Sequence, residues 1–437
     1  MSERNDAVRR SAPGRGVPLG RLLPLVVAVG LATPAMAVRL AGAEPPALFS
    51  VLIYGAAFIG AALLLAWGTE LAQLDLPRGL AVSMLALIAI LPEYAVDLLF
   101  AFQAGSDPSR APLALANMTG ANRLLIGVGW SLVVLVAALG FRRARRGRPD
   151  QGAQFSFQLG RLSSVDVVLL AVISLYSLNL LFRPSLTLLD SVILIALFVF
   201  YVARLWRAPK EVPEFIGPPA LISRLSAGPR RTVTVLLMVV AAAVILLSAE
   251  PFSGSLISAG DQLGVDSFLM VQWIAPLATE TAELIPACIF AWRQSADEGL
   301  GTLLSSKINQ WSLLVGAVPL AFLLGGGGLG GLPMDPAQRQ ELFLTAAQSV
   351  FAVSLLTDRK LSVREAVLIL LLFLGDFIAS VLLSEDTRVF ARIGFAALYL
   401  VLALLWLTRA RRRLPRLFRD ALIVPPAQLV EKEPRRA

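Results

Sequence analysis

Residues 74–93 read LDLPRGLAVSMLALIAILPE, and residues 263–283 read LGVDSFLMVQWIAPLATETAE. Each stretch begins with a leucine and an aspartate close together and continues as an apolar run. Each ends on a glutamate, Glu93 in the first copy and Glu283 in the second. A charged side chain inside a hydrocarbon layer costs at least about 2.5 kcal/mol, so such residues are usually functional. Two copies of one arrangement therefore predict an ion or substrate pathway built from both halves of the chain.

The composition predicts a polytopic membrane protein. Of the 437 residues, 57% are hydrophobic and only 16% are charged, whereas globular proteins carry about 25% charged residues. Apolar stretches of about 20 residues, the length that crosses a bilayer, recur along the chain. About twelve spans are expected, near residues 22–41, 47–69, 79–104, 112–140, 164–182, 186–206, 231–249, 265–292, 299–325, 340–356, 362–384 and 389–408. The predicted fold class is an all-α transmembrane helical bundle.

The net charge of +9 indicates topology rather than nucleic-acid binding. Basic residues are concentrated in alternate loops, and the loops between them are short and poor in Lys and Arg. The basic segments are Arg4 to Arg21, Arg142 to Arg148, Arg204 to Arg231, Arg359 to Arg364 and Arg409 to Arg419. By the positive-inside rule these loops and both termini are cytoplasmic. The expected location is a bacterial-type inner (plasma) membrane, with the lipid bilayer and inorganic cations as partners.

Several other classes of function lack their sequence signals. The chain has no histidine and a single cysteine, Cys288, so it cannot form an internal disulfide. It contains neither His-Glu-x-x-His nor Gly-x-Ser-x-Gly, and the glycine run 325–328 lacks the Lys-Ser/Thr ending of a phosphate loop. We therefore expect no enzyme activity and no cofactor. Residues 1–37 fit either a first span or a cleavable signal peptide.

The spacing of the two glutamate stretches predicts two inverted repeats of five helices each. An odd number of spans reverses the orientation of the second copy, and such repeats place a transport site near the midplane. The expected organisation is a cytoplasmic N-terminus and first span (1–46), repeat 1 (47–206), a cytoplasmic linker (207–230), repeat 2 (231–384), and a last span with a basic cytoplasmic tail (385–437). The first and last spans then flank a ten-helix core.

Prolines close to both glutamates supply free backbone oxygens. A proline has no N–H, so the carbonyl four residues before it loses its helical partner. By this rule Pro92 frees the carbonyl of Ile88, Pro276 that of Gln272, and Pro286 that of Ala282. Carbonyl and carboxylate oxygens are the ligands that Ca²⁺ prefers. An ordinary helix kink, with each glutamate paired to a base, is the alternative.

Further polar residues accompany each glutamate. Asp97 follows Glu93 by four residues and Glu280 precedes Glu283 by three, so each pair shares a helix face. The next span of each repeat carries a polar stripe, consisting of Asn117, Thr119 and Asn122 in the first copy and Thr302, Ser305, Ser306, Lys307 and Asn309 in the second. Such stripes either pack helices together or supply ligand oxygens.

These paired motifs resemble those of the calcium/cation antiporter superfamily, which includes the sodium/calcium exchangers. That family carries two inverted repeats, each with Gly-Thr-Ser-x-Pro-Glu followed by Gly-Asn-x-x-Gly-Ser-Asn. Here the first copy matches as IAILPE at 88–93 and ANMTGAN at 116–122. The second matches as ATETAE at 278–283 and GTLLSSK at 301–307. The resemblance covers most of residues 50–385, with degraded motifs.

The resemblance implies an antiporter that exchanges Ca²⁺ for Na⁺ or H⁺. It implies that Glu93 and Glu283 bind the divalent cation, with Asn117, its counterpart Thr302, and the hydroxyl of Thr279 as further ligands. It also implies that spans 2 and 7 slide over the site to alternate access. The family's first-repeat hydroxyls are replaced by Ala89 and Ile90, which puts a full set of sodium sites in doubt.

Lys307 is the sharpest departure from the family pattern. It replaces the second family asparagine, which is Asn122 in the first copy. Its ammonium either takes the place of one bound Na⁺, exchanges protons, or forms an internal ion pair with Asp376 or Glu280. Arg123 allows the same interpretation as a buried ion pair.

Two further hypotheses stay open beside calcium exchange. The lost hydroxyls and Lys307 fit a proton-coupled or monovalent-cation exchanger of the same fold. The degraded motifs also fit a membrane protein that no longer transports and acts as a binding or scaffold subunit.

Overall fold

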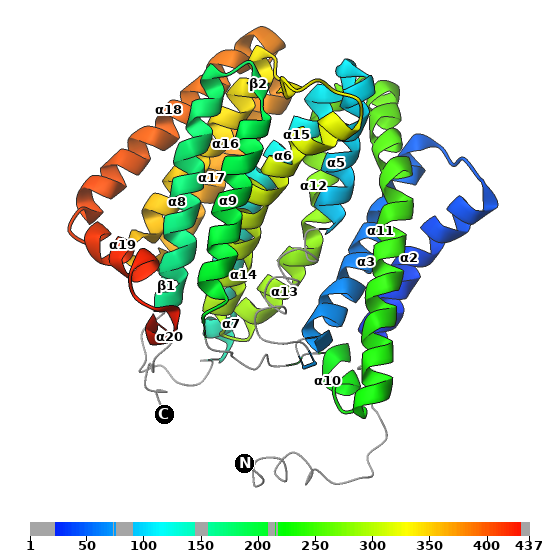
Figure 1. Cartoon of the computed structure of the whole chain (residues 1–437), viewed down its shortest axis with the longest axis horizontal. Coiled ribbons are helices and arrows are strands. Elements are labelled where there is room, and N and C mark those ends of the chain that lie inside the picture. Colours follow the sequence, from blue (N-terminus) through cyan, green and yellow to red (C-terminus); the bar gives the residue numbers. More distant parts are fainter. Residues whose placement is uncertain are drawn as a thin grey trace.

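The computed structural model describes residues 22–72, 74–75, 91–144, 156–208, 215 and 217–429 as a helical assembly with two short two-stranded sheets (Figure 1). The elements of the first half are α2 (Leu23–Ala41), α3 (Ala47–Ala72), α5 (Leu91–Ser106), η2 (Pro108–Arg110), α6 (Ala111–Leu124), η3 (Leu125–Trp130), α7 (Ser131–Ala144), β1 (Ser156–Gln158), η4 (Arg161–Ser163), α8 (Ser164–Leu178), η5 (Asn179–Phe182), β2 (Ser185–Leu186) and α9 (Leu188–Leu205). This order fits the predicted all-α class.

The second half also contains long helices, a π-helical segment and short strands. It consists of α10 (Pro218–Ile222), α11 (Ala227–Leu263), α12 (Ser267–Thr279), α13 (Thr281–Trp292), α14 (Ala296–Asn309), η6 (Gln310–Leu314), α15 (Val315–Leu324), β3 (Leu332–Pro333), α16 (Pro336–Leu355), η7 (Leu356–Asp358), β4 (Lys360–Ser362), α17 (Val363–Leu382), α18 (Glu385–Ala410), α19 (Leu414–Leu422) and α20 (Pro426–Leu429). Both sheets join the halves, because β1 pairs with β4 and β2 pairs with β3, each antiparallel.

The helices confirm a multi-pass membrane protein. In the described part of the chain, nine helices are long and apolar enough to cross a membrane, or ten if α12 and α13 form one bent span. The other two predicted spans are not among these ten candidates. The span at 79–104 lies partly outside the described residues, and α16 has the length of a span but is not among these apolar helices. The number of about twelve spans stays a prediction.

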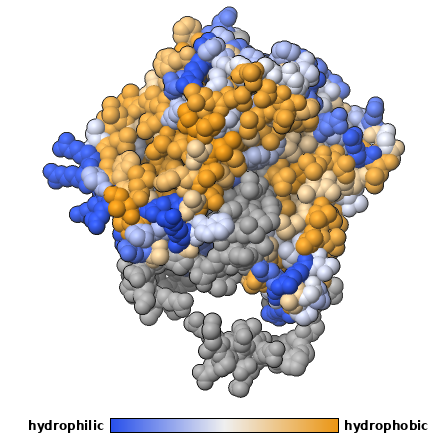
Figure 2. Space-filling view, viewed as in Figure 1, coloured by the Kyte–Doolittle hydropathy of each residue, from blue (hydrophilic) through white to orange (hydrophobic). Residues whose placement is uncertain are grey.

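The surface agrees with this arrangement. Figure 2 shows apolar residues over the middle of the visible face, with hydrophilic residues gathered toward its ends. In Figure 1, β2 lies at one end of the helices, and α10, α19 and α20 lie at the opposite end. The segments around α10 and α19 contain many of the arginines that the positive-inside rule assigns to the cytoplasm. We call this the basic end.

Helix boundaries follow local capping signals. Side-chain capping boxes begin α9 at Thr187, α16 at Asp335 and α17 at Ser362. The predicted span 231–249 was too short, because α11 continues through Pro251 to Leu263 and is capped by Gly264. Pro251 removes a single hydrogen bond, whereas Gly264 adopts the left-handed conformation that terminates a helix (φ 63°).

Three helices form a bundle at one side of the molecule. In Figure 1, α2, α3 and α11 lie together at the right, and α3 packs against both of the others. Phe58 of α3 meets Phe252 of α11 edge to face, with ring centroids 5.1 Å apart. At Gly68 of α3, a Cβ atom would lie 2.7 Å from Met238 of α11. The glycine therefore permits close packing of the first helices of the two repeats.

Candidate functional site

The two glutamates of the sequence repeats lie on short helices in the interior. Glu93 belongs to α5, and Glu283 lies in the first turn of α13. The path from α12 to α13 bends by 52° around Glu280. A helix that is broken at membrane depth exposes backbone groups, and proteins tolerate such breaks where they line a site.

Both glutamates are buried and close enough for their charges to interact. Glu93 is 0% exposed and Glu283 is 5% exposed. Glu93 also interacts electrostatically with Asp97 and Glu280, which are themselves buried. We call these four carboxyl groups the acidic cluster. The acidic cluster thus contains carboxyl groups from both halves of the chain.

The oxygens of the two glutamates lack hydrogen-bond donors among the described residues. Neither carboxylate oxygen of Glu93 or of Glu283 has such a partner, and one oxygen each of Asp97 and Glu280 is also left unpaired. Buried polar atoms are almost always hydrogen-bonded, so a group of unpaired oxygens calls for an explanation such as a bound ion. An unsatisfied buried group costs about 1–3 kcal/mol, and more when it is charged.

Two predicted hydroxyl residues border these glutamates. Thr279 lies at the end of α12 beside Glu93, and its hydroxyl donates to the carbonyl of Ala275 at 3.3 Å. Ser306 of α14 lies beside Glu283. Both side chains are buried and place an oxygen next to a carboxylate from the other repeat or helix.

Amide side chains hold the outer acids of the acidic cluster. Asn117 Nδ2 donates to Asp97 Oδ1 at 2.6 Å, which leaves Asn117 Oδ1 unpaired. Gln310 Nε2 donates to Glu280 Oε1 at 2.7 Å, and Gln310 Oε1 is unpaired as well. Each amide therefore satisfies one carboxylate oxygen and presents its own oxygen as a further acceptor.

The side chains of Gln310 and of two further polar residues are absent from the candidates chosen from the sequence, in which Gln272 appears only through its backbone carbonyl. Gln272 of α12 is fully buried, and both its side-chain oxygen and nitrogen lack partners among the described residues. Tyr94 donates to Asn309 Oδ1 at 3.1 Å, which joins α5 to α14. The sequence contained a signal for Gln272, since a glutamine inside an apolar run is unusual. Gln272 also lies four residues before Pro276.

Thr302 does not join this group. Its side chain is exposed, and its hydroxyl donates to the carbonyl of Glu298 on its own helix at 2.9 Å. The expectation that Thr302 is the ligand equivalent to Asn117 is therefore corrected. The reason is its position, because Thr302 lies one turn before Ser306, closer to the start of α14.

Lys307 bonds to the opposite repeat rather than to Asp376. Its Nζ atom lies 2.6 Å from Asn122 Oδ1 and 3.1 Å from the Asn122 carbonyl oxygen. The ammonium also lies 4.7 Å from the centre of the Trp311 ring and interacts electrostatically with Glu280. The predicted pairing with Asp376 was wrong, because Asp376 binds Arg123 instead.

Two π-helical segments mark equivalent places in the repeats. The fourteen-residue helix α6 continues into η3 at Leu125, and the fourteen-residue helix α14 continues into η6 at Gln310. Asn122 and Lys307 each lie three residues before the segment that follows them. Short π-helical segments occur frequently at functional sites, and these two were not predicted from the sequence.

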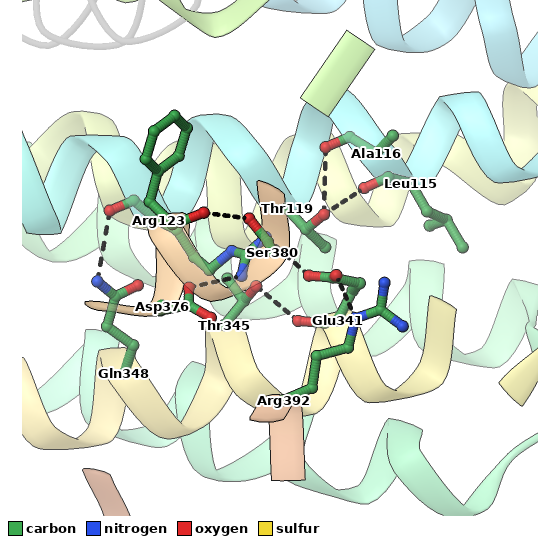
Figure 3. Close-up of polar contacts among 11 residues, drawn as sticks. Leu115, Ala116, Thr119, Arg123, Glu341, Thr345, Gln348, Asp376, Ser380 and Arg392 are labelled. Carbon is green, nitrogen blue, oxygen red and sulfur yellow. Dashed lines mark hydrogen bonds and ion pairs between the residues drawn. The ribbon is translucent and has the colours of Figure 1, made fainter. Parts of the chain in front are cut away.

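A second buried cluster contains Arg123, and each of its charged side chains lies close to an opposite charge. Arg123 lies 2.7 Å from Glu341 and 2.9 Å from Asp376, and Glu341 in turn lies 2.7 Å from Arg392. Figure 3 shows these four side chains, which come from α6, α16, α17 and α18, directed toward one another. We call them the arginine cluster. The prediction of an ion pair for Arg123 is confirmed, and Trp273 covers its guanidinium at 4.8 Å.

The acids alone do not form a conventional metal centre. In the part of the chain that the structure describes, no group of three or more Asp, Glu or Cys side chains is arranged to hold a metal ion. A cation between Glu93 and Glu283 would need amide, hydroxyl or backbone oxygens in addition, and Ca²⁺ accepts such mixed oxygen shells.

Comparisons with known proteins agree with this architecture. Residues 46–207 and 233–383 match the model of the family described as sodium/calcium exchanger protein. A solved structure described as the H⁺/Ca²⁺ exchanger CAX is 35% identical, with a TM-score of 0.84 over 92% of this chain and 98% of that one. The structure of native YfkE is 14% identical, with a TM-score of 0.58 over 86% of this chain and 99% of that one, and shares the fold. None of the curated proteins compared with this sequence matches it.

Proposed function

We propose that this chain, which belongs to the sodium/calcium exchanger protein family, is a secondary active antiporter that carries Ca²⁺ in exchange for protons. Glu93 and Glu283 would bind the Ca²⁺ ion between the two repeats. The basic end would face the cytoplasm of a bacterial-type plasma membrane. We assign the chain a transport function and no enzymatic reaction.

One observation carries this proposal: the buried carboxylates of Glu93 and Glu283 interact electrostatically, and among the described residues no donor lies within hydrogen-bonding geometry of their oxygens. Buried charges are stable only when they are paired or when they coordinate an ion. One divalent cation between the two glutamates neutralises both. The arrangement is therefore favourable when Ca²⁺ is present and costly when the carboxylates are ionised without it.

The remaining ligands would come from neighbouring amides and hydroxyls. Asn117 Oδ1 and Gln272 Oε1 are buried acceptors without partners among the described residues, and Thr279 and Ser306 border the glutamates. Six to eight oxygens surround Ca²⁺ in proteins, so two glutamates must be supplemented in this way. Thr302 is not part of the proposed shell.

The proton is the preferred coupling ion for two reasons. The relative that is 35% identical over 92% of this chain is described as an H⁺/Ca²⁺ exchanger. In addition, two protons on the two carboxylates carry the same charge as one Ca²⁺ ion, so the same pair of groups can bind either cargo in turn. Sodium as the coupling ion is the second candidate, since the family description names sodium.

The three-helix bundle suggests how access alternates. Helices α3 and α11 are the first helices of the two repeats and pack against each other through Phe58 and Phe252. Small residues at such contacts let helices approach closely. We propose that α3 and α11 move together over the site, which opens it first to one side of the membrane and then to the other.

The test is uptake of radioactive calcium into inverted membrane vesicles under an imposed proton or sodium gradient. We expect proton-driven uptake in the wild type and a loss of at least about 100-fold in Glu93→Gln and in Glu283→Gln. A 100-fold change corresponds to a free-energy difference of about 2.8 kcal/mol. Glu44→Gln is the matched control, because Glu44 is exposed between α2 and α3.

The outcomes separate the competing functions. Uptake that survives both glutamate substitutions would overturn the assigned site. Uptake driven only by sodium would replace the proton as coupling ion. Transport of a monovalent cation without calcium would favour the monovalent exchanger. A folded protein that transports no cation and gains no thermal stability from any cation would be the binding or scaffold subunit.

A further inference from the structure

The ammonium group of Lys307 occupies a small site made of oxygens from the other repeat. Lys307 is fully buried on α14, and its Nζ atom contacts two oxygens of one residue, Asn122 Oδ1 at 2.6 Å and Asn122 O at 3.1 Å. Asn122 Nδ2 donates to the Met118 carbonyl at 2.8 Å. This bond fixes the amide so that its oxygen faces Lys307.

The other surroundings of the ammonium also favour a cation. The ring of Trp311, one turn further along the chain, lies 4.7 Å from Nζ, and aromatic faces attract cations at such distances. Glu280 supplies a negative charge that acts on Lys307 and is itself bonded to Gln310. A side-chain amide oxygen, a backbone carbonyl, a π face and a nearby carboxylate together form a site for a monovalent cation.

The position of Asn122 at the end of α6 explains why a backbone oxygen can contribute. The π-helical segment η3 begins three residues after Asn122, and the change from α-helical to π-helical bonding alters the partners of the preceding carbonyls. The equivalent segment η6 begins three residues after Lys307. The contact therefore joins two equivalent places of the repeats, one with an amide and the other with an ammonium.

We infer that Lys307 is a tethered cation that fills a monovalent-cation site between the repeats, so that the exchanger needs no mobile ion at that site. The inference rests on the proposed function only in assigning the neighbouring glutamates to the cargo. The ammonium balances the charge of Glu280, which leaves Glu93 and Glu283 as the pair that one divalent ion neutralises. Lys307 would thus determine the charge of the cargo without contacting it.

The test removes the tethered cation and offers mobile ones. In Lys307→Ala, calcium transport is expected to fall at least about tenfold, equivalent to 1.4 kcal/mol. Methylammonium, ammonium or Na⁺ added at equal concentration on both sides of the vesicle should restore transport to within about threefold of the wild type. Lys307→Met fills the same volume with an uncharged chain, so its transport should stay as low in all three salts as that of Lys307→Ala without added cation. Lys307→Arg keeps the charge and should need no added cation.

A second measurement does not depend on transport. Purified Lys307→Ala should gain thermal stability from methylammonium or Na⁺ at constant ionic strength, whereas the wild type and Lys307→Met should not. This readout separates the two proposals, since binding of a monovalent cation by Lys307→Ala is measurable even if no calcium exchange is found. If Lys307→Ala cannot be purified folded, Lys307→Asn, which restores the residue type of Asn122, takes its place.

Three results would overturn the inference. The first is wild-type transport by Lys307→Ala without added cation. The second is a folded Lys307→Ala protein that no monovalent cation stabilises or reactivates. The third is failure of both Lys307→Ala and Lys307→Asn to fold in every one of these salts, because a site that accepts a mobile cation should recover its stability.

Discussion

Two clusters of charged side chains lie buried in this protein, and they differ in how completely they are paired. In the arginine cluster, two arginines face two carboxylates, and every member has an opposite charge within 2.9 Å. In the acidic cluster, four carboxyl groups adjoin a single ammonium, and the oxygens of Glu93 and Glu283 have no donors among the described residues. The charged side chains of both clusters are buried, but only those of the arginine cluster are each paired with an opposite charge. This difference indicates that the two clusters have different roles.

The arginine cluster joins four helices, including the flanking helix α18, by charges that satisfy one another. Such a cluster fixes how helices pack and needs nothing from outside. The acidic cluster needs an external cation to reach the same balance. The comparison therefore teaches that missing opposite charges, and not burial alone, distinguish the proposed transport site from a structural network in this interior.

The largest expected effect tests the structural role of the arginine cluster. Arg123→Met leaves Glu341 and Asp376 with one partner fewer, and breaking a buried ion pair costs about 3–5 kcal/mol. Unfolding of the purified protein by heat or denaturant measures this loss. Arg161→Met is the control, because Arg161 pairs with Asp420 at the surface, where such pairs contribute at most about 1 kcal/mol. Equal losses in the two variants would show that the arginine cluster has no special structural role.

The next effect tests whether the acidic cluster requires a cation. Calcium at about a hundred times its dissociation constant should stabilise the wild type by about 2.7 kcal/mol. Glu93→Gln should lose this stabilisation, and Glu44→Gln should keep it. The measurement is thermal unfolding with and without calcium. If calcium stabilised Glu93→Gln as much as the wild type, calcium would not bind at the unpaired carboxylates. The proposed difference between the two clusters would then be wrong.

A third prediction reverses the sign of the same substitution in the two clusters. With calcium removed by a chelator at alkaline pH, Glu93→Gln should raise stability by about 1 kcal/mol, because it removes an unpaired buried charge. Glu341→Gln removes a charge that two arginines pair, so it should lower stability by about 3 kcal/mol. Denaturant unfolding of both variants under identical conditions gives the two signs. The same sign for both would contradict the distinction between a cation-dependent cluster and a self-sufficient one.

Much of the fold could be predicted because apolar stretches of about 20 residues identify membrane-spanning helices. The described helices follow the predicted spans from α2 to α18, and the matching glutamate stretches indicated two repeats. The finer details were not predictable in this way. The length of α11 depends on whether Pro251 ends a helix or only removes one bond, and tertiary packing decides that.

The candidate site was predictable where a residue type alone was unusual. Glu93, Glu283, Asp97 and Glu280 stood out as acids in apolar runs, and the structure places all four together in the interior. Their partners were not predictable, since pairing depends on contacts distant in sequence. Arg123 and Asp376 are 253 residues apart, and the Lys307–Asn122 contact spans 185 residues. Thr302 was misplaced for a different reason, because it lies one turn before Ser306 on α14 and is exposed.

The smallest expected effect extends the comparison to the surface of the basic end. Asp75, just after α3, accepts hydrogen bonds from Arg230 and Arg231 of α11, both at 2.9 Å. The hydrogen bond from Arg230 is the main reason why the pKa of Asp75 lies below its ordinary value. The carboxylate is therefore more easily ionised in the folded protein than in the unfolded one, and it stabilises the fold above the unfolded pKa of about 3.9.

The free energy of unfolding should therefore differ between the wild type and Asp75→Asn, by an amount that depends on pH. At neutral pH the variant should lose less than about 1 kcal/mol of stability, because the ion pairs of Asp75 with Arg230 and Arg231 are partly exposed and screened by solvent. As the pH falls through the lowered pKa, the wild-type carboxylate becomes protonated and the difference should vanish. Unfolding measured across this range, with the exposed Asp261→Asn as control, tests the claim. A difference that persists unchanged in acid would mean that Asp75 holds α3 against α11 by its shape and not by its charge, unlike either buried cluster.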